Sequence, residues 1–163
     1  QGYRRIGVIS GAPSHLATID RIQGWQKALR EAGIEPELYH IAEGDYSPAS
    51  GASGFLQLLD SFSGMDGLFA CNDQMALGAM QTAAKLGVQI PQELGVVGFD
   101  DRAEAPFLTP PLTSINHHFE EMGSLVIGEI DRLIKMSPQE REHAETIDHW
   151  ITPELVVRAS SQR

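Results

Sequence analysis

The sequence predicts an α/β fold organised around a doubly wound parallel sheet. From Arg4 to Phe99, short apolar runs alternate with helical patterns, and this stretch begins and ends with a strand. The runs are continuously apolar, which is typical of parallel strands that helices cover on both faces. A chain of 163 residues, 42% of them hydrophobic, is long enough to bury the core of one such domain.

Four strands and three helices are expected in this first part of the chain. The first helix carries Ile22, Trp25 and Leu29 at helical spacing, and Gly33 stands where a helix C-terminus favours a left-handed residue. The strands are predicted at residues 4–10, 35–42, 67–71 and 93–99, and the helices at residues 19–33, 47–64 and 74–87.

The alternation breaks after Phe99. Residues 100–115 are irregular and contain three prolines, and they end in a short predicted strand at 112–115. A helix is predicted over 119–136, with Asp131 and Lys135 as an i,i+4 ion pair. Its apolar side consists of Phe119, Met122, Val126, Ile130 and Leu133. A polar connector, residues 137–146, leads to one or two last strands within 149–161.

Charge and cysteine usage exclude some classes of protein. The net charge of −10 is opposite to that of a nucleic-acid-binding surface, so these residues are not expected to bind DNA themselves. Cys71 cannot form an internal disulfide, and its apolar surroundings predict a small buried side chain. A lone cysteine favours a reducing compartment, hence the cytoplasm. Gln1 is not a start methionine, so we expect a processed chain or a fragment.

Polar residues follow each predicted strand. Because ligands bind outside the carboxyl ends of the strands in open parallel sheets, these residues predict a ligand site. They are Ser10 to His15, Glu43, Asp45 and Tyr46, Asn72 and Asp73, and Asp100 and Asp101. Asn72 or Asp73 can cap the helix that follows, and the other side chain then faces the crevice. Capping is the role that we expect of Asp73 rather than of Asn72.

The acidic pair Asp100-Asp101 has three interpretations. A magnesium site of the response-regulator type fails, because the first strand ends in Ser10-Gly11 instead of paired acids. A catalytic carboxylate pair stays open, although no partner base or nucleophile accompanies it. A carboxylate that accepts hydrogen bonds from two vicinal hydroxyls fits best.

Other sites find little support in the sequence. Adjacent histidines such as His117 and His118 point in different directions, so a metal site with Glu120 and Glu121 is disfavoured. Phosphate-binding loops, nucleophile elbows and zinc or thiol motifs are absent from the sequence. We therefore expect neither an enzyme nor a cofactor.

Several segments resemble the effector-binding core of the lactose-repressor/galactose-repressor family of bacterial transcription regulators. They are "GWQKALREAGI", "GLFACNDQMALGAMQTAAKLGVQIPQELGVVGFDD", "LTPPLTSI" and "PELVVRASS". The resemblance implies a core like that of periplasmic binding proteins, in which two Rossmann-like lobes close on a small ligand. It implies that residues 1–115 are the C-terminal lobe and that residues 116–163 are a crossover helix and strands that return between the lobes. The DNA-binding head and most of the first lobe would precede Gln1.

The same resemblance implies roles for single residues. It implies an effector site formed by Arg21, Tyr46, Asn72, Asp100, His117 and Phe119, in which Tyr46 stacks on a sugar ring. For Arg21 the alternative is a solvated helix residue, and for Phe119 it is core packing. The implied dimer surface consists of Leu77, Ala105, Pro106, Phe107 and Leu108. The alternative for Phe107 is that it folds back on its own lobe.

The expected function is therefore that of a homodimeric transcriptional regulator that acts as a repressor. Its partners would be a small sugar-like effector and, through the missing head only, operator DNA. It would have no membrane partner. The isolated chain holds one wall of the cleft, so it should bind effector weakly or not at all. The main rival is a periplasmic sugar-binding protein of a transport system, and an enzyme on the same kind of sheet is the second.

Overall fold

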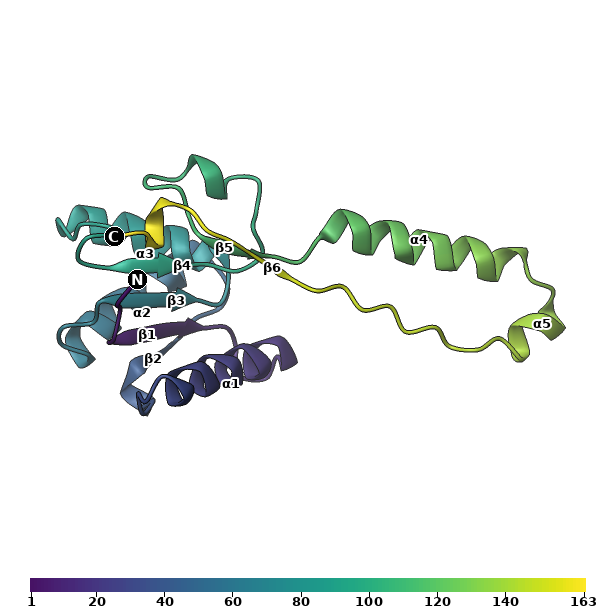
Figure 1. The fold of residues 1–163 in the computed structure, drawn as a ribbon, viewed down its shortest axis with the longest axis horizontal. Helices are drawn as coiled ribbons and strands as arrows, with labels where there is room; N and C mark the ends of the chain where they lie inside the picture. The colour runs from purple at the N-terminus through teal and green to yellow at the C-terminus, as the bar shows by residue number, and fades with distance from the viewer. The chain divides into compact units, whose positions relative to one another are not determined.

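A computed structural model describes residues 1–163, with the exception of the side chain of Tyr39. The chain forms two compact units. Unit 1 consists of Gln1–Ile115 and Leu155–Arg163, and unit 2 consists of Asn116–Glu154 (Figure 1). Among the described residues, no helix is long and apolar enough to cross a membrane.

Unit 1 contains the predicted parallel sheet. Its strands are β1 (Ile6–Ser10), β2 (Ile41–Glu43), β3 (Gly67–Ala70) and β4 (Gly95–Val97), and their order in the sheet is β2-β1-β3-β4. All three strand pairs are parallel. The connection from β1 to β2 runs towards one edge of the sheet, and the connection from β2 to β3 runs back past β1. Because crossovers between parallel strands are right-handed, the helices in these two connections lie on opposite faces of the sheet. The predicted α/β class and the parallel sheet are confirmed.

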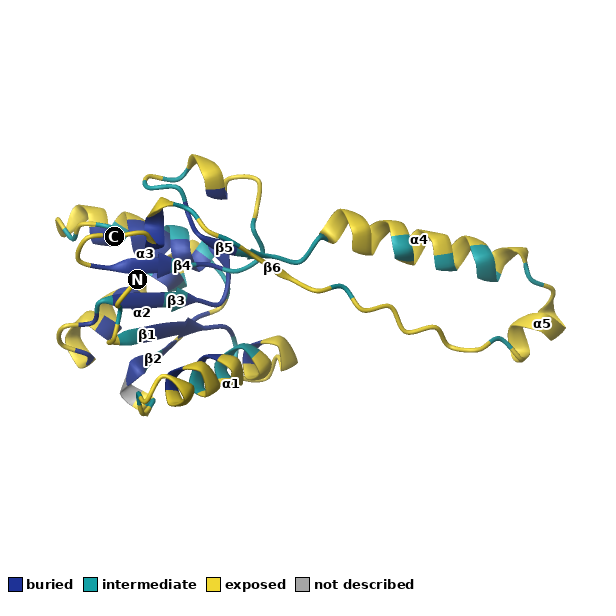
Figure 2. Ribbon diagram, viewed as in Figure 1, coloured by how far each residue is buried: buried dark blue, intermediate teal, exposed yellow. Residues whose placement is uncertain are grey.

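Three helices cover this sheet, close to their predicted ranges. They are α1 (Leu16–Glu31), α2 (Pro48–Ser61) and α3 (Asp73–Lys85). Gly33 and Gly87 have φ angles of 73° and 76°, the left-handed conformation expected just beyond α1 and α3. Between the sheet and the helices lies an apolar core that includes Ile9, Phe55 and Leu68. Most of the residues in the four strands are buried (Figure 2).

The prediction of a second strand over residues 35–42 is largely wrong. Residues Leu38–His40 form a 3-10 turn, η1, and only Ile41 and Ala42 of the predicted range enter β2. The cause is a local hydrogen bond, because the backbone N–H of Glu37 donates to Nδ1 of His40 over 3.1 Å. The His40 ring also stacks on Phe62, with ring centroids 3.9 Å apart, which draws the turn onto the core.

A tail and a loop complete unit 1. Strand β5 (Ser114–Asn116) begins two residues later than predicted and pairs with β6 (Glu154–Val156) in a two-stranded sheet. Two short turns, η2 (Ala105–Phe107) and η3 (Ala159–Ser161), lie in the loop before β5 and in the tail after β6.

Unit 2 is built on the predicted helix, observed as α4 (Phe119–Lys135). The expected ion pair is present, with 2.6 Å between Lys135 Nζ and an oxygen of Asp131. The predicted polar connector contains a short helix, α5 (Pro138–Glu142), which Ser137 caps through its side chain. No residue of α4 is buried, and most of its apolar side is exposed (Figure 2).

Candidate ligand-binding site

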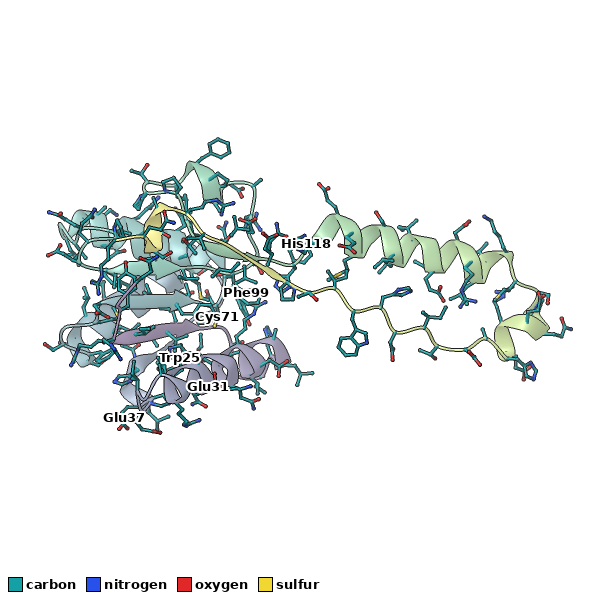
Figure 3. The ribbon with its side chains drawn as sticks, viewed as in Figure 1. Trp25, Glu31, Glu37, Cys71, Phe99 and His118 are labelled. Atoms are coloured by element: carbon teal, nitrogen blue, oxygen red, sulfur yellow. The ribbon has the colours of Figure 1, made fainter. Side chains whose placement is uncertain are left out.

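The residues after the carboxyl ends of β3 and β4 meet around the side chain of Arg21. This guanidinium lies 3.8 Å from the ring centroid of Phe99 and donates from Nη1 to the carbonyl oxygen of Cys71 over 2.5 Å. Phe99 and Cys71 are labelled in Figure 3. Its Nη2 lies 3.8 Å from Oδ1 of Asp100. The side chain is only 16% exposed, so the alternative of a solvated helix residue is wrong.

Asp100 and Asp101 have separate partners. Asp100 faces Arg21, whereas Asp101 accepts a hydrogen bond from Nη1 of Arg158 over 2.7 Å. The structure therefore gives no support to a shared catalytic carboxylate pair. Both aspartates have left-handed φ angles, 110° and 50°. Such backbone costs about 1–3 kcal/mol per non-glycine residue and is common at functional sites.

Asn72 is the cap of α3, contrary to our expectation that Asp73 would have this role. Its Oδ1 accepts from the backbone N–H of Met75 over 2.8 Å, and its Nδ2 donates to the carbonyl oxygen of Tyr46 over 3.0 Å. The reason is conformational, since Asn72 has extended φ and ψ angles, as an N-cap requires, while Asp73 is already helical.

Asp73 turns inward and does not face the crevice. Its carboxylate accepts from Oγ of Ser114 over 2.6 Å and from the backbone N–H of Arg102 over 2.8 Å. Burial raises the pKa of this carboxyl group, although both hydrogen bonds oppose the shift. Asp73 thus ties α3 to the loop after β4 and to β5.

Tyr46 is held in place on the same side of the sheet. Its hydroxyl lies 2.5 Å from Oγ1 of Thr18, and its ring stacks with His15 at a centroid distance of 5.7 Å and an interplanar angle of 9°. A Cβ added to Gly11 would overlap the Tyr46 ring, so a larger residue there would displace Tyr46 from this position. His15 is one of the polar residues predicted from their place after the first strand, whereas Thr18 in α1 was not predicted.

The geometry of unit 1 agrees with the comparisons to known proteins. The family model described as a periplasmic binding protein-like domain matches residues 1–161. The chain belongs to this family. A curated relative, the HTH-type transcriptional repressor PurR of Edwardsiella ictaluri, is 35% identical over 160 residues, which are 98% of this chain and 46% of the relative.

Solved structures of transcriptional regulators match the chain closely. The transcriptional regulator CelR–cellobiose complex has a TM-score of 0.83 and 34% identity, covering 98% of this chain and 47% of that one. The lac repressor dimer bound to operator and the anti-inducer ONPF has a TM-score of 0.84 and 30% identity, covering 99% and 54%. The resemblance to this group of regulators is confirmed. The chain spans about half the length of the curated relatives that it matches.

The remaining two predicted effector residues, His117 and Phe119, belong to unit 2. There the rings of His117 and Phe119 lie 5.3 Å apart. Phe119 is 56% exposed, so it does not pack in a core within unit 2. The described residues contain no group of three or more histidine, cysteine or acidic side chains that could hold a metal ion.

Only part of the predicted dimer surface is exposed. Phe107 is 84% exposed, so the alternative that it folds back on its own lobe is wrong. Pro106 is exposed as well, and Leu77 and Leu108 are half-buried. The prediction that Ala105 belongs to the dimer surface is wrong, because only 1% of this residue is exposed. Its backbone N–H and C=O both form hydrogen bonds within the loop. It anchors this loop and offers no side chain to a partner.

Proposed function

We propose that this chain is the C-terminal part of the ligand-sensing core of a LacI-type transcriptional regulator, and that its ligand is a small sugar or sugar derivative. The observation that carries the proposal is the arrangement of Arg21 and Asp100. A guanidinium and a carboxylate stand together at the carboxyl edge of a parallel sheet, where such sheets bind their ligands.

This pair has the chemistry that sugar recognition requires. An ionised carboxylate accepts hydrogen bonds from vicinal hydroxyls, and a guanidinium donates to hydroxyl oxygens from a rigid fork. The Tyr46 ring supplies an apolar surface of the kind that packs on a sugar face. The regulator CelR, which was solved in complex with cellobiose, is 34% identical to this chain over the region that the two share, and this favours the same ligand class.

The proposal assigns roles to the rest of the chain as well. Unit 1 corresponds to the second lobe, and unit 2 corresponds to the crossover elements that return between the lobes. The exposed apolar side of α4 packs on a first lobe that this sequence does not contain. A ligand then controls operator binding through the difference between its affinities for the two lobe arrangements. Leu77, Pro106, Phe107 and Leu108 form the contact between two copies.

A calorimetric titration tests the proposal. The protein is the natural longer chain that contains residues 1–163, and the ligands are cellobiose, D-glucose, D-galactose and D-ribose. We expect at least one sugar to bind with a Kd of about micromolar order. Asp100→Asn and Arg21→Gln should each weaken it about tenfold or more, because each removes a hydrogen bond to a charged group.

Asp60→Asn is the matched control, since it removes an exposed carboxylate of α2 outside the site and should leave affinity unchanged. Sugar binding that is insensitive to both Asp100→Asn and Arg21→Gln would contradict the proposed site. Micromolar binding by the 163-residue chain alone would contradict the idea that it holds only one wall of the cleft.

A further inference from the structure

The turn that presents Asp100 has a backbone conformation that needs outside support. Asp100 and Asp101 are consecutive non-glycine residues with φ angles of 110° and 50°. Residues in such regions keep their conformation only where the surrounding structure over-determines it. The position of the Asp100 carboxylate therefore depends on whatever holds this turn.

Backbone groups of the turn are bonded to β5 and α3. The N–H of Asp100 donates to the carbonyl oxygen of Ile115 over 2.9 Å, and the N–H of Asp101 donates to Oγ of Ser114 over 3.0 Å. The N–H of Arg102 donates to Oδ2 of Asp73 over 2.8 Å. These bonds fix the peptide units of the turn on the side of β5.

The C-terminal tail supplies a further contact, through Arg158. Its Nη1 donates both to Oδ1 of Asp101 and to the carbonyl oxygen of Leu112, each over 2.7 Å. The side chains of Arg158 and Asp101 are only 17% and 10% exposed. An ion pair so far removed from water is sensitive to the loss of either partner, because the remaining charge is left buried.

Arg158 is itself held firmly. Its backbone N–H donates to Oγ1 of Thr113 over 2.8 Å, and its carbonyl oxygen accepts from the same hydroxyl over 2.9 Å. Two residues later, Ser160 accepts from the N–H of Thr113 and donates to the carbonyl oxygen of Val96. The guanidinium is therefore presented to the turn from a fixed backbone.

We propose that Arg158 is a positioning residue for the ligand-binding turn, which acts through Asp101 to hold the Asp100 carboxylate beside Arg21. This inference rests on the proposed function for the role of Asp100, but it makes a claim about the turn that can be tested without any ligand. A further consequence is that the tail, which follows unit 2 in the chain, is bonded directly to the turn that carries Asp100.

The test is amide hydrogen exchange of the 163-residue chain, measured by NMR without ligand. In Arg158→Gln we expect the amides of Asp100 and Asp101 to exchange about tenfold faster than in the unaltered chain. The amides of β1 and β3 should be unchanged. Asp101→Asn should have the same effect, because asparagine tolerates the left-handed backbone and loses only the charge.

The double variant and two further arginine variants separate positioning from general stability. Arg158→Gln with Asp101→Asn should exchange no faster than either single variant, since the two residues act through one contact. Arg158→Lys should restore part of the protection. Arg163→Gln is the matched control, because Arg163 lies on the same tail but pairs with Asp66 and Tyr3, and it should leave the turn unchanged.

Two results would overturn the proposal. One is unchanged exchange of the Asp100 and Asp101 amides in Arg158→Gln, and the other is an equal acceleration of all amides in unit 1, which would make Arg158 a general stabiliser. Failure of the proposed function looks different, because sugar binding by the longer chain would then be insensitive to Asp100→Asn whatever the exchange rates show.

Discussion

At the scale of single residues, Cys71 shows how burial decides reactivity. Its side chain is fully buried at the end of β3, and burial raises the pKa of the thiol to about 11. The thiolate is the reactive form, so at pH 8 a thiol with this pKa is almost entirely protonated. The predicted buried side chain is confirmed.

We expect native Cys71 to resist Ellman's reagent at pH 8 and to react within minutes in urea, as followed by absorbance. Because the pKa is higher in the folded chain than in the unfolded one, the free energy of unfolding should also fall as pH rises from about 9 towards 11. Rapid reaction of the native chain would show that the thiol is accessible and contradict this account.

Asn72 has two structural contacts that substitutions can separate. Asn72→Ala removes the cap of α3 and should lower the free energy of unfolding by about 1–2 kcal/mol. Asn72→Asp keeps an acceptor for the Met75 N–H and loses the donor to Tyr46, so its cost should come from that contact alone. Urea denaturation measures both. Equal stability of Asn72→Ala and the unaltered chain would contradict the capping role.

At the scale of elements, α2 and α3 pack at a distance that only glycine allows. A Cβ added to Gly78 would overlap the carbonyl oxygen of Pro48, and one added to Gly51 would overlap the backbone of Met75. Both glycines are buried. The short side chains along this seam therefore set the spacing of the two helices.

Gly78→Ala should lower the free energy of unfolding by about 1–3 kcal/mol, because overpacking outweighs the better helix propensity of alanine. Gly24→Ala in α1 is the matched control. A Cβ there meets nothing within 4 Å, so this change should stabilise the chain by about 0.5–1 kcal/mol. Thermal denaturation compares them, and a stabilised Gly78→Ala would show that the helices are not in close contact.

The elements of unit 1 were predictable where local sequence determines them. Continuous apolar runs identified β1, β3 and β4, and the glycines at 33 and 87 marked the ends of α1 and α3. The prediction of a strand over residues 35–42 was wrong, because a hydrogen bond to the His40 ring stabilises a turn there. The spacing of apolar residues gives no sign of such a turn.

The candidate site was predictable only in part. Tyr46, Asn72 and Asp100 were expected at a ligand site because they follow predicted strands, whereas Arg21 came from the family resemblance alone. Asp101 and its partner Arg158 are 57 residues apart in the chain, and Asp73 and Ser114 are 41 apart. Contacts at such separations leave no local pattern, so the supports of the Asp100 turn could not be inferred from the sequence.

At the scale of the whole molecule, the two tryptophans differ in exposure. Trp150 is 92% exposed, in a stretch of unit 2 without helix or strand, whereas Trp25 is 7% exposed in α1. Proteases cleave exposed, irregular segments first. The tail beyond this point is anchored in unit 1 through Arg158 and Ser160.

Chymotrypsin should therefore cleave first after Trp150 and leave the peptide bond after Trp25 intact. The released ends should stay together under native conditions, because the contacts of the tail persist. Mass spectrometry of the digest identifies the cut, and size-exclusion chromatography with and without urea tests whether the pieces separate. Early cleavage after Trp25, or loss of residues 151–163 from native unit 1, would contradict the described packing.

The central claim is that this chain senses a ligand for a transcriptional regulator, and the most direct test is to read the coding DNA upstream of Gln1. The stretch to read is roughly the length of one more lobe and a small head. We predict a helix-turn-helix head followed by a lobe-sized α/β segment. A signal peptide followed by a lobe without such a head would instead make the protein a transport receptor and contradict the proposed link to DNA.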